Sequence, residues 1–436
     1  MISMPQQLPA ANIPLAVSAA STSGGKAIFL AVALIYSLLL PPQTHLNLGG
    51  FVLPPYRLLL IPATIFIIRE LLTGRTRFRS PDMLVVIAVL WIGIALINTM
   101  GMNRMAPGAG AQFIDIALAY FLARTTIKSP RDMRLLLIYS VPGLFLAAMS
   151  IIAESVSHRI IVQSFAGSLL GGGFLGENTV RLGLLRAPGP FPHAILAGLF
   201  LSSFLPLFFL SRLRGMPRFL GILAALASFF TVSSAAILAL VVGLVLLGYD
   251  WITRVVDFLT WRIFLIFAGI TFFVLEFATQ GGAISIISRV AALNSWNAFY
   301  RTLIWRYGSE SVQNYPIFGI GYNEWVRPMW MTSSVDNFWL MLAMQYGLIT
   351  PIALLVAVLI ATVTVARSSP HLNEADLMMK RGVAMALVIF TFGIYSVSVW
   401  LSAQVWYFML LGIAVTLGID GLQSASPQRL QKSRKR

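Results

Sequence analysis

The stretch SSVDNFWLMLAMQYGLITPIALLVAVLIATVTVAR, residues 333–367, decides the fold class. From Asn337 onward it is one apolar run, and runs of about 17–25 apolar residues cross the hydrocarbon core of a membrane as a helix. The run is longer than one crossing needs, so Gly347 and Pro351 predict a tilt or a break within it. A polar pair, Asp336 and Asn337, stands at its start, where an ionisable carboxylate contributes nothing to membrane insertion.

The rest of the 436-residue chain has the same character. Hydrophobic residues make up 58% of it and charged residues 11%, roughly half the charged fraction of a soluble protein. The sequence therefore predicts an all-α polytopic membrane protein with about twelve transmembrane helices. No internal repeat stands out, so residues 1–436 are expected to form a single membrane domain. The predicted helices lie near residues 27–42, 51–69, 83–99, 110–123, 134–153, 191–210, 217–232, 233–249, 262–279, 337–367, 382–399 and 403–420.

Composition excludes several other classes of function. The chain has no cysteine, hence no disulfide and no thiolate chemistry, and its four histidines lack metal-ligand spacing. The first 26 residues do not read as a cleavable signal peptide. The net charge of +16 would suit nucleic acid, but the basic residues form short clusters between apolar runs. Such clusters are typical of membrane topology, so we expect no nucleic-acid partner.

The basic clusters also predict the orientation. With a cytoplasmic N-terminus, the inside segments include RELLTGRTRFRS, RTTIKSPRDMR, SRLRGMPR and the basic tail 421–436. Of the 31 Lys and Arg residues, 22 then fall inside, eight fall outside, and Arg57 lies within the second run; every Lys is inside. Both termini are therefore expected to be cytoplasmic. Two long loops, residues 154–190 and 280–336, are expected outside.

The cations expected outside are all arginines: Arg104, Arg159, Arg181, Arg186, Arg289, Arg301, Arg306 and Arg327. Arginine presents a planar fork that matches phosphate and stays charged when partly desolvated. Anchoring to lipid headgroups is the alternative for any single one. The concentration of arginines in two loops favours an anionic ligand at headgroup depth. Arg186 lies in LLRAPGPFPHA, whose prolines would aim it stiffly at one place.

The segment NSWNAFYRTLIWRYGSESVQNYPIFGIGYNEW, residues 294–325, predicts a helix followed by a turn. Apolar residues recur at helical spacing between Trp296 and Val312, as in an amphipathic helix lying on a membrane. Arg301 and Arg306 are about 140° apart on such a helix and need not share a face. In the turn, Gly319 and Gly321 permit close approach of the backbone.

Together these motifs resemble the O-antigen ligase and O-antigen polymerase (Wzy-type) superfamily of bacterial membrane glycosyltransferases. The family pattern has an Arg before Gly-x-Phe and a proline, then an Arg shortly before a Trp, a Pro-hydrophobic-Phe-Gly-x-Gly turn, a polar pair and a Gly. The matching positions here are Arg186, Gly189, Phe191, Pro192, Arg301, Trp305, Pro316 to Gly321, Asp336, Asn337 and Gly347. Ligases have a His in the polar pair, where this chain has Asp336.

The resemblance implies a GT-C-like helical bundle with a large periplasmic loop in the bacterial inner membrane. It implies metal-independent, cofactor-free transfer of sugar from an undecaprenyl-diphosphate-linked oligosaccharide to a glycan acceptor at the periplasmic face. Membrane lipids and a chain-length regulator are further expected partners. The Asp-Asn pair favours a polymerase of O-antigen or exopolysaccharide repeat units. The alternatives are a ligase that transfers polymer to lipid A-core and a polysaccharide-lipid transporter or flippase, the latter disfavoured because the two halves of the chain do not resemble each other.

Roles for single residues follow as hypotheses. Arg186 and Arg301 would clamp the diphosphate, and Asp336 would accept the proton of the acceptor hydroxyl. The other interpretation of Asp336 is a helix N-cap. Asp115, at membrane depth, is interpreted as the partner of Arg57 in a structural ion pair. Supporting roles fall to Arg289 or Arg306 at the diphosphate and to Tyr322, Glu324 and Asn337 at the sugar hydroxyls.

Overall fold

The computed structural model describes residues 24–48, 51–172, 178–278, 295–367 and 372–423. Regular structure in these residues is almost entirely helical, with two short antiparallel hairpins. The first part of the chain forms α1 (Gly24–Leu38), η1 (Pro42–Thr44), β1 (Leu46–Leu48), β2 (Phe51–Leu53), α2 (Pro55–Leu72), α3 (Ser80–Met100), α4 (Met102–Gln112), η2 (Phe113–Leu118), α5 (Ala119–Thr126), α6 (Pro130–Ser157), α7 (Val162–Leu170), β3 (Val180–Arg181) and β4 (Leu184–Leu185).

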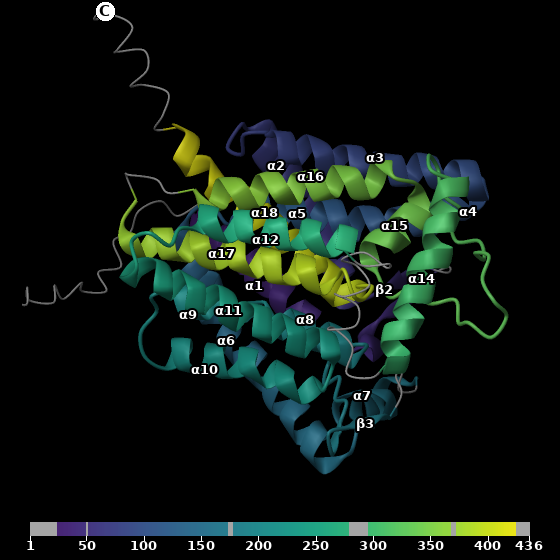
Figure 1. Cartoon of the computed structure of the whole chain (residues 1–436), viewed down its shortest axis with the longest axis horizontal. Coiled ribbons are helices and arrows are strands. Elements are labelled where there is room, and N and C mark those ends of the chain that lie inside the picture. The colour runs from purple at the N-terminus through teal and green to yellow at the C-terminus, as the bar shows by residue number, and fades with distance from the viewer. Residues whose placement is uncertain (1–23, 49–50, 173–177, 279–294, 368–371, 424–436) are drawn as a thin grey trace, which may run out of the picture.

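In the second part, all the regular structure of the described residues is helical. It forms α8 (Ala194–Ser202), α9 (Phe204–Leu210), α10 (Met216–Leu226), η3 (Ala227–Thr231), α11 (Ser234–Val255), α12 (Trp261–Ala278), α14 (Ser295–Asn314), α15 (Phe338–Tyr346), α16 (Ile349–Ala366), α17 (Glu374–Gly393) and α18 (Leu401–Gln423). Most of these helices run side by side as a bundle, and α14 crosses one end of it (Figure 1). We call this the α14 end.

Each predicted apolar run overlaps a helix, although α17 begins and ends several residues before the run predicted at 382–399, and the chain is an all-α membrane protein. Among the described residues, six helical segments are long and apolar enough to cross a membrane, and four shorter apolar helices accompany them. Charged residues such as Arg69 and Glu70 interrupt α2, and Lys380 and Arg381 interrupt α17. The six long segments are Ser80–Met100, Ala106–Thr126, Pro130–Ser157, Ser234–Val255, Ile349–Ala366 and Leu401–Gly418.

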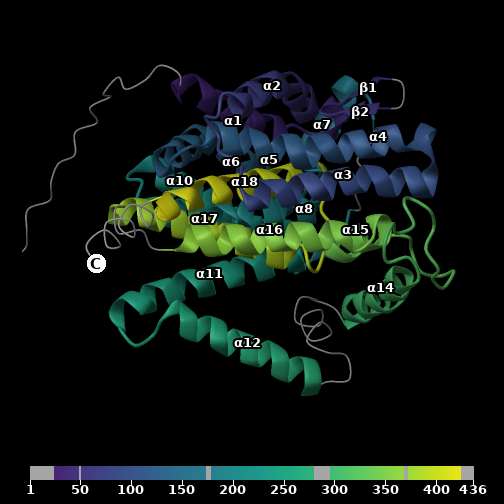
Figure 2. The same ribbon diagram turned by 90° about the horizontal axis from the view of Figure 1, so that it is seen from above.

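Helix α18 forms the centre of the bundle. Its residues from Ser402 to Gly418 are buried, and α5, α16 and α17 pack around it. The indole of Trp406 stacks on Phe204, with 4.5 Å between ring centres, and donates a hydrogen bond to Ser203 Oγ at 2.8 Å. Helix α12 differs, because it stands apart from the bundle in Figure 2 and meets α11 mainly through Tyr249.

Buried ion pairs join helices of the bundle. Arg57 on α2 donates to both carboxylate oxygens of Asp115 on η2, at 2.8 and 2.6 Å. The predicted pairing of Asp115 with Arg57 is confirmed. A second fully buried pair joins Arg124 to Asp82 at 2.7 Å. Such pairs satisfy charges that would otherwise be very costly away from water.

The long apolar run at 337–367 is broken where it was expected to be. Helix α15 ends at Tyr346, Gly347 adopts a φ of +78°, and α16 starts two residues later. A positive φ is open to glycine at little cost, so Gly347 ends the helix. Pro351 lies in the first turn of α16, where its missing N–H is not needed.

Candidate active site

Helix α15 is capped by Asn337 and not by Asp336. Asn337 Oδ1 accepts the backbone N–H of Leu340 at 2.9 Å, the usual bond of an N-cap. The backbone N–H of Phe338 donates to the carbonyls of Ile394 and Val397, at 3.0 and 3.2 Å, and so fixes the start of α15 to the turn after α17. The capping role considered for Asp336 therefore falls to its neighbour.

Asp336 instead faces a small cavity that it shares with Arg301. The cavity has a volume of about 10 Å³, close to the space that one water molecule needs. Trp305 from α14 and Tyr395 and Ser396 from the turn after α17 complete its walls. The structure thus brings together three of the residues singled out from the sequence, Arg301, Asp336 and Asn337.

The electrostatics of this cavity follow from burial and two arginines. Burial raises the pKa of the Asp336 carboxyl above its ordinary value, and the nearby charges of Arg301 and Arg186 oppose that rise. Burial also lowers the pKa of Arg301, while Asp336 acts in the opposite direction. Asp336, Arg301 and Arg186 therefore lie within electrostatic reach of one another.

The turn that carries Arg186 is held by a buried glutamate of α6. Glu154 Oε1 accepts the backbone N–H groups of Ile161 and Val162, at 2.9 and 2.8 Å, and its Oε2 accepts that of Gly189 at 2.8 Å. Gly189 has a φ of +54°, and a Cβ there would lie 2.6 Å from Ile151. The carboxylate and the glycine together fix the turn that follows Arg186.

Arg181 and His193 lie beside Arg186. Arg181 is on β3, and β3 pairs with β4, which leads directly into Arg186. His193 caps α8, its Nδ1 accepting the backbone N–H of Ile195 at 3.1 Å. Burial lowers the pKa of His193 to about 4, and the charges of Arg186 and Arg181 add to this effect. Arg181 also acts on the pKa of Arg301, so the arginines of the two loops form one positive cluster.

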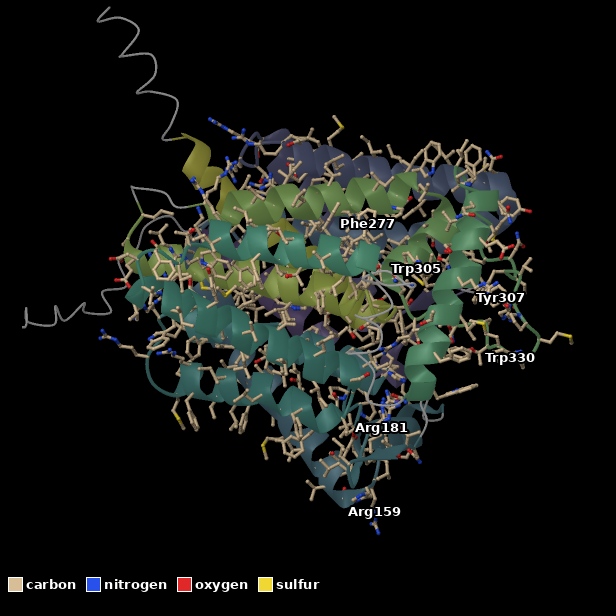
Figure 3. The ribbon with its side chains drawn as sticks, viewed as in Figure 1. Arg159, Arg181, Phe277, Trp305, Tyr307 and Trp330 are labelled. Atoms are coloured by element: carbon tan, nitrogen blue, oxygen red, sulfur yellow. The ribbon has the colours of Figure 1, made fainter. Side chains whose placement is uncertain are left out.

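Helix α14 presents Arg301 and Arg306 on different sides. Trp305 points toward the bundle in Figure 3, where its ring lies 6.2 Å from that of Tyr395, and Arg301 lines the same cavity. Tyr307 lies on the other side of α14, and the Arg306 guanidinium sits 5.8 Å from the centre of its ring. Arg306 is exposed and does not line the Asp336 cavity.

The glycine turn after α14 docks on the end of α15. The backbone N–H groups of Ile320 and Gly321 donate to the carbonyls of Met344 and Gln345, at 2.8 and 3.0 Å. These carbonyls lie in the last turn of α15, where no intrahelical donor remains for them. A Cβ on Gly319 would lie 2.4 Å from Met344 O, and one on Gly321 would lie 2.5 Å from Thr99 Oγ1. The close backbone approach predicted for both glycines is confirmed.

Tyr322 and Glu324 do not line the Asp336 cavity. The Tyr322 hydroxyl is 3.1 Å from that of Tyr346. Glu324 is exposed and forms an ion pair with Arg327. Arg289 falls outside the described residues. Of the eight residues singled out, Asp336, Arg301 and Asn337 line the cavity, and Arg186 acts on it through its charge.

Sequence reasoning missed Glu154 and His193. The available signal for Glu154 was a lone carboxylate at the end of a long apolar helix, which is uncommon unless it has partners. His193 directly follows the proline-rich motif and had no spacing that suggested a role. Tyr395 and Ser396 had no signal at all, because they reach the cavity only through the fold.

Comparison with known families agrees with this geometry. Residues 219–355 match the family model described as O-antigen ligase. The resemblance inferred from the motifs is confirmed over this segment, and the match supports a ligase- or polymerase-type function. A search of curated proteins returned no match.

The matched segment includes much of the cavity. Arg301, Asp336 and Gly347 fall inside residues 219–355, together with the glycine turn. Arg186, Glu154 and His193 precede the matched segment. The fold therefore brings the charge of Arg186, from outside the matched segment, close to the Asp336 carboxylate inside it.

Proposed function

We propose that this protein is a polysaccharide polymerase. It transfers glycan repeat units from a polyprenyl-diphosphate carrier at the periplasmic face of the inner membrane, in O-antigen or exopolysaccharide synthesis. The observation that carries the proposal is the shared cavity of Asp336 and Arg301, with the charge of Arg186 beside it. A carboxylate next to cations at a membrane surface suits the deprotonation of a hydroxyl and the departure of a diphosphate.

The reaction divides between these residues. The acceptor hydroxyl oxygen attacks the anomeric carbon, and the bond from that carbon to the diphosphate oxygen breaks. The electron pair of the broken bond stays on the diphosphate, whose charge Arg301 and Arg186 stabilise. The hydroxyl proton passes to the Asp336 carboxylate and then to water. Because burial raises the pKa of Asp336, its carboxylate is a stronger base than an exposed one.

In the topology that we propose, the Asp336 cavity faces the periplasm. We infer a single membrane domain of about twelve spans in a GT-C-like bundle, both termini cytoplasmic and the α14 end periplasmic. The absence of cysteine makes single-cysteine labelling clean. In spheroplasts, an impermeant maleimide should label Ser309→Cys on α14 and should label Ser433→Cys only after permeabilisation. The reverse pattern would overturn the orientation.

The activity is tested in liposomes that contain the purified protein and lipid-linked repeat units. Wild type should give a polymer ladder on a gel, and Arg301→Ala and Asp336→Asn should abolish it at normal expression. Gln313→Ala, an exposed change on the same helix, is the matched control and should preserve the ladder. A ladder that survives Asp336→Asn would remove the proposed base.

A ligase is the second candidate, because the matched family model is described as O-antigen ligase. In that case wild type would form no ladder from repeat units alone. It would instead transfer preformed polymer when lipid A-core or another acceptor is added. Silence with every acceptor would favour a polysaccharide-lipid transporter, the remaining alternative.

A further inference from the structure

A second and larger cleft lies beside α14. It has a volume of about 560 Å³, within the range of sites that hold small organic ligands. Tyr307, Glu310, Ser311 and Asn314 line it from α14, at the spacing that places residues on one face of a helix. The other walls come from the end of α3, from the glycine turn and from residues 323–326.

This cleft is separate from the Asp336 cavity. Arg301, Ile304 and Trp305 line that cavity from α14, and their face lies roughly 120° around an ideal helix from the face that lines the cleft. Trp305 and Tyr307 accordingly lie on opposite sides of α14 in Figure 3. A single helix therefore divides the two spaces at the α14 end.

The cleft differs from the cavity in the charge of its lining residues. Its walls contain no Lys or Arg but two carboxylates, Glu310 and Glu324. Glu324 pairs with Arg327, whereas Glu310 has no ion-pair partner among the described residues. A phosphate would be disfavoured here, because the lining residues include Glu310 and no Lys or Arg.

The side chains suit a sugar chain instead. Amide groups come from Asn98, Asn314 and Asn323, and each both donates and accepts hydrogen bonds, as sugar hydroxyls require. Aromatic rings come from Tyr307 and Tyr315, the latter 56% exposed, and supply flat apolar surfaces for the C–H faces of sugars. Polar groups converge with aromatic ones in a single cleft, as they do in ligand sites.

We propose that this cleft binds a part of the glycan remote from the reacting sugar, and that it favours neutral or amino sugars over uronic acids. The assignment rests on the proposed function, since it requires glycan at the α14 end. The cavity then handles the diphosphate and the anomeric carbon, while the cleft holds sugars that do not react.

Binding of free oligosaccharide to the purified full chain tests the proposal without any transfer. The probe is the repeat oligosaccharide released by mild acid from the carrier lipid of the source bacterium. Its counterpart is the same oligosaccharide with primary hydroxyls oxidised to carboxylates. The wild type should bind the oxidised form at least about fivefold more weakly, and Glu310→Gln should narrow that difference.

Variants separate the cleft from the cavity. Tyr307→Ala and Asn314→Ala should each weaken binding about fivefold or more, whereas Gln313→Ala should not, because Gln313 lines neither the cleft nor the cavity. Arg301→Ala and Asp336→Asn should bind like wild type, which distinguishes this site from the reacting one. Tyr307 is partly buried, so the exposed Asn314 keeps the test valid if Tyr307→Ala folds poorly.

The outcomes distinguish the two proposals. The proposal that the cleft binds glycan would be overturned if wild type does not bind the oligosaccharide, even if polymer is made. It would also be overturned if neither Tyr307→Ala nor Asn314→Ala weakens binding. If these variants weaken binding but the protein transfers sugar to no acceptor, the glycan-binding role of the cleft would be supported and the polymerase function would be overturned. Equal binding of the native and oxidised forms would overturn the preference for neutral or amino sugars.

Discussion

Asp336 and Arg301 line the same small cavity, although Asp336 precedes α15 and Arg301 lies on α14. Asn337 caps α15, which leaves the Asp336 carboxylate without a part in starting the helix. An ionisable group at this place is therefore best explained by chemistry at the α14 end. The predictions below separate that chemistry from folding.

Exchanging Asp336 and exchanging Asn337 should have different effects. Asp336→Asn should fold normally and lose transfer activity by about 100-fold or more, since a general base contributes about that much. Asn337→Ala should lose about 1 kcal/mol of stability through the missing cap. Thermal unfolding in detergent and the ladder assay, run on both variants, measure the two effects. Equal loss of stability in both variants would contradict the separation.

The transfer rate should fall in acid as Asp336 takes up a proton. Burial raises its pKa, so the fall should begin at a higher pH than for an exposed Asp. The charge of Arg186 lowers that pKa, so Arg186→Gln should move the fall to still higher pH, and Arg186→Lys should not. The kcat/KM of wild type and the residual kcat/KM of the two Arg186 variants, measured against pH, give the shift of the acid limb.

His193 should not contribute to that acid limb. Its pKa is lowered to about 4, so it is neutral over the range in which such an enzyme is assayed. His193→Asn retains a side chain that caps helices well and should leave the pH profile unchanged. A shifted acid limb in His193→Asn would show that the titration belongs to His193 and not to Asp336.

Glu154 should act on stability and on the placement of Arg186. Glu154→Ala leaves three backbone N–H groups without their acceptor, and we expect a loss of about 3 kcal/mol or more. Glu154→Gln keeps an oxygen that can accept two of these N–H groups, but it turns an N–H₂ toward the third. Its loss of stability should therefore be smaller than that of Glu154→Ala. Melting temperatures in detergent give the order wild type, Gln, Ala; a reversed order would count against the three-bond arrangement.

The Arg57–Asp115 pair should matter for folding and not for transfer. Asp115→Asn leaves a buried Arg57 without its charge partner, which typically costs about 3–5 kcal/mol. Protein abundance in the membrane should fall while activity per molecule stays near wild type. Arg57→Met combined with Asp115→Leu removes both charges and should restore part of the abundance. A defect confined to activity would point to a functional Asp115.

Gly347 should tolerate no side chain. Its φ is +78°, and a Cβ would lie 1.9 Å from the carbonyl oxygen of Ile317. Gly347→Ala should therefore displace the glycine turn and cost about 3 kcal/mol or more. Gly248→Ala on α11 is the matched control, because nothing lies within 4 Å of the added Cβ and Ala favours helix. Comparable melting temperatures for the two variants would refute the close approach.

Part of the candidate site was readable from the sequence because motifs are local. The glycine turn, the break at Gly347 and the helix at 295–314 follow from residue types and their spacing. The separation of Arg301 from Arg306 follows from helix geometry alone. The finding that Tyr322 and Glu324 do not line the cavity did not follow, because they lie in an irregular segment whose course depends on the helices around it.

The sequence by itself determined the class of the protein, because the length and polarity of each apolar run are local properties that fix a membrane helix. It also determined the approximate positions of those helices and the polar pair that opens α15. The exact ends of the helices did not follow, since the run predicted at 382–399 is the helix Glu374–Gly393. Only the tertiary structure decided that Asn337 caps the helix and that Asp336 meets Arg301 and Arg186. The direction of a side chain depends on contacts between segments far apart in the chain, and no local pattern specifies such contacts.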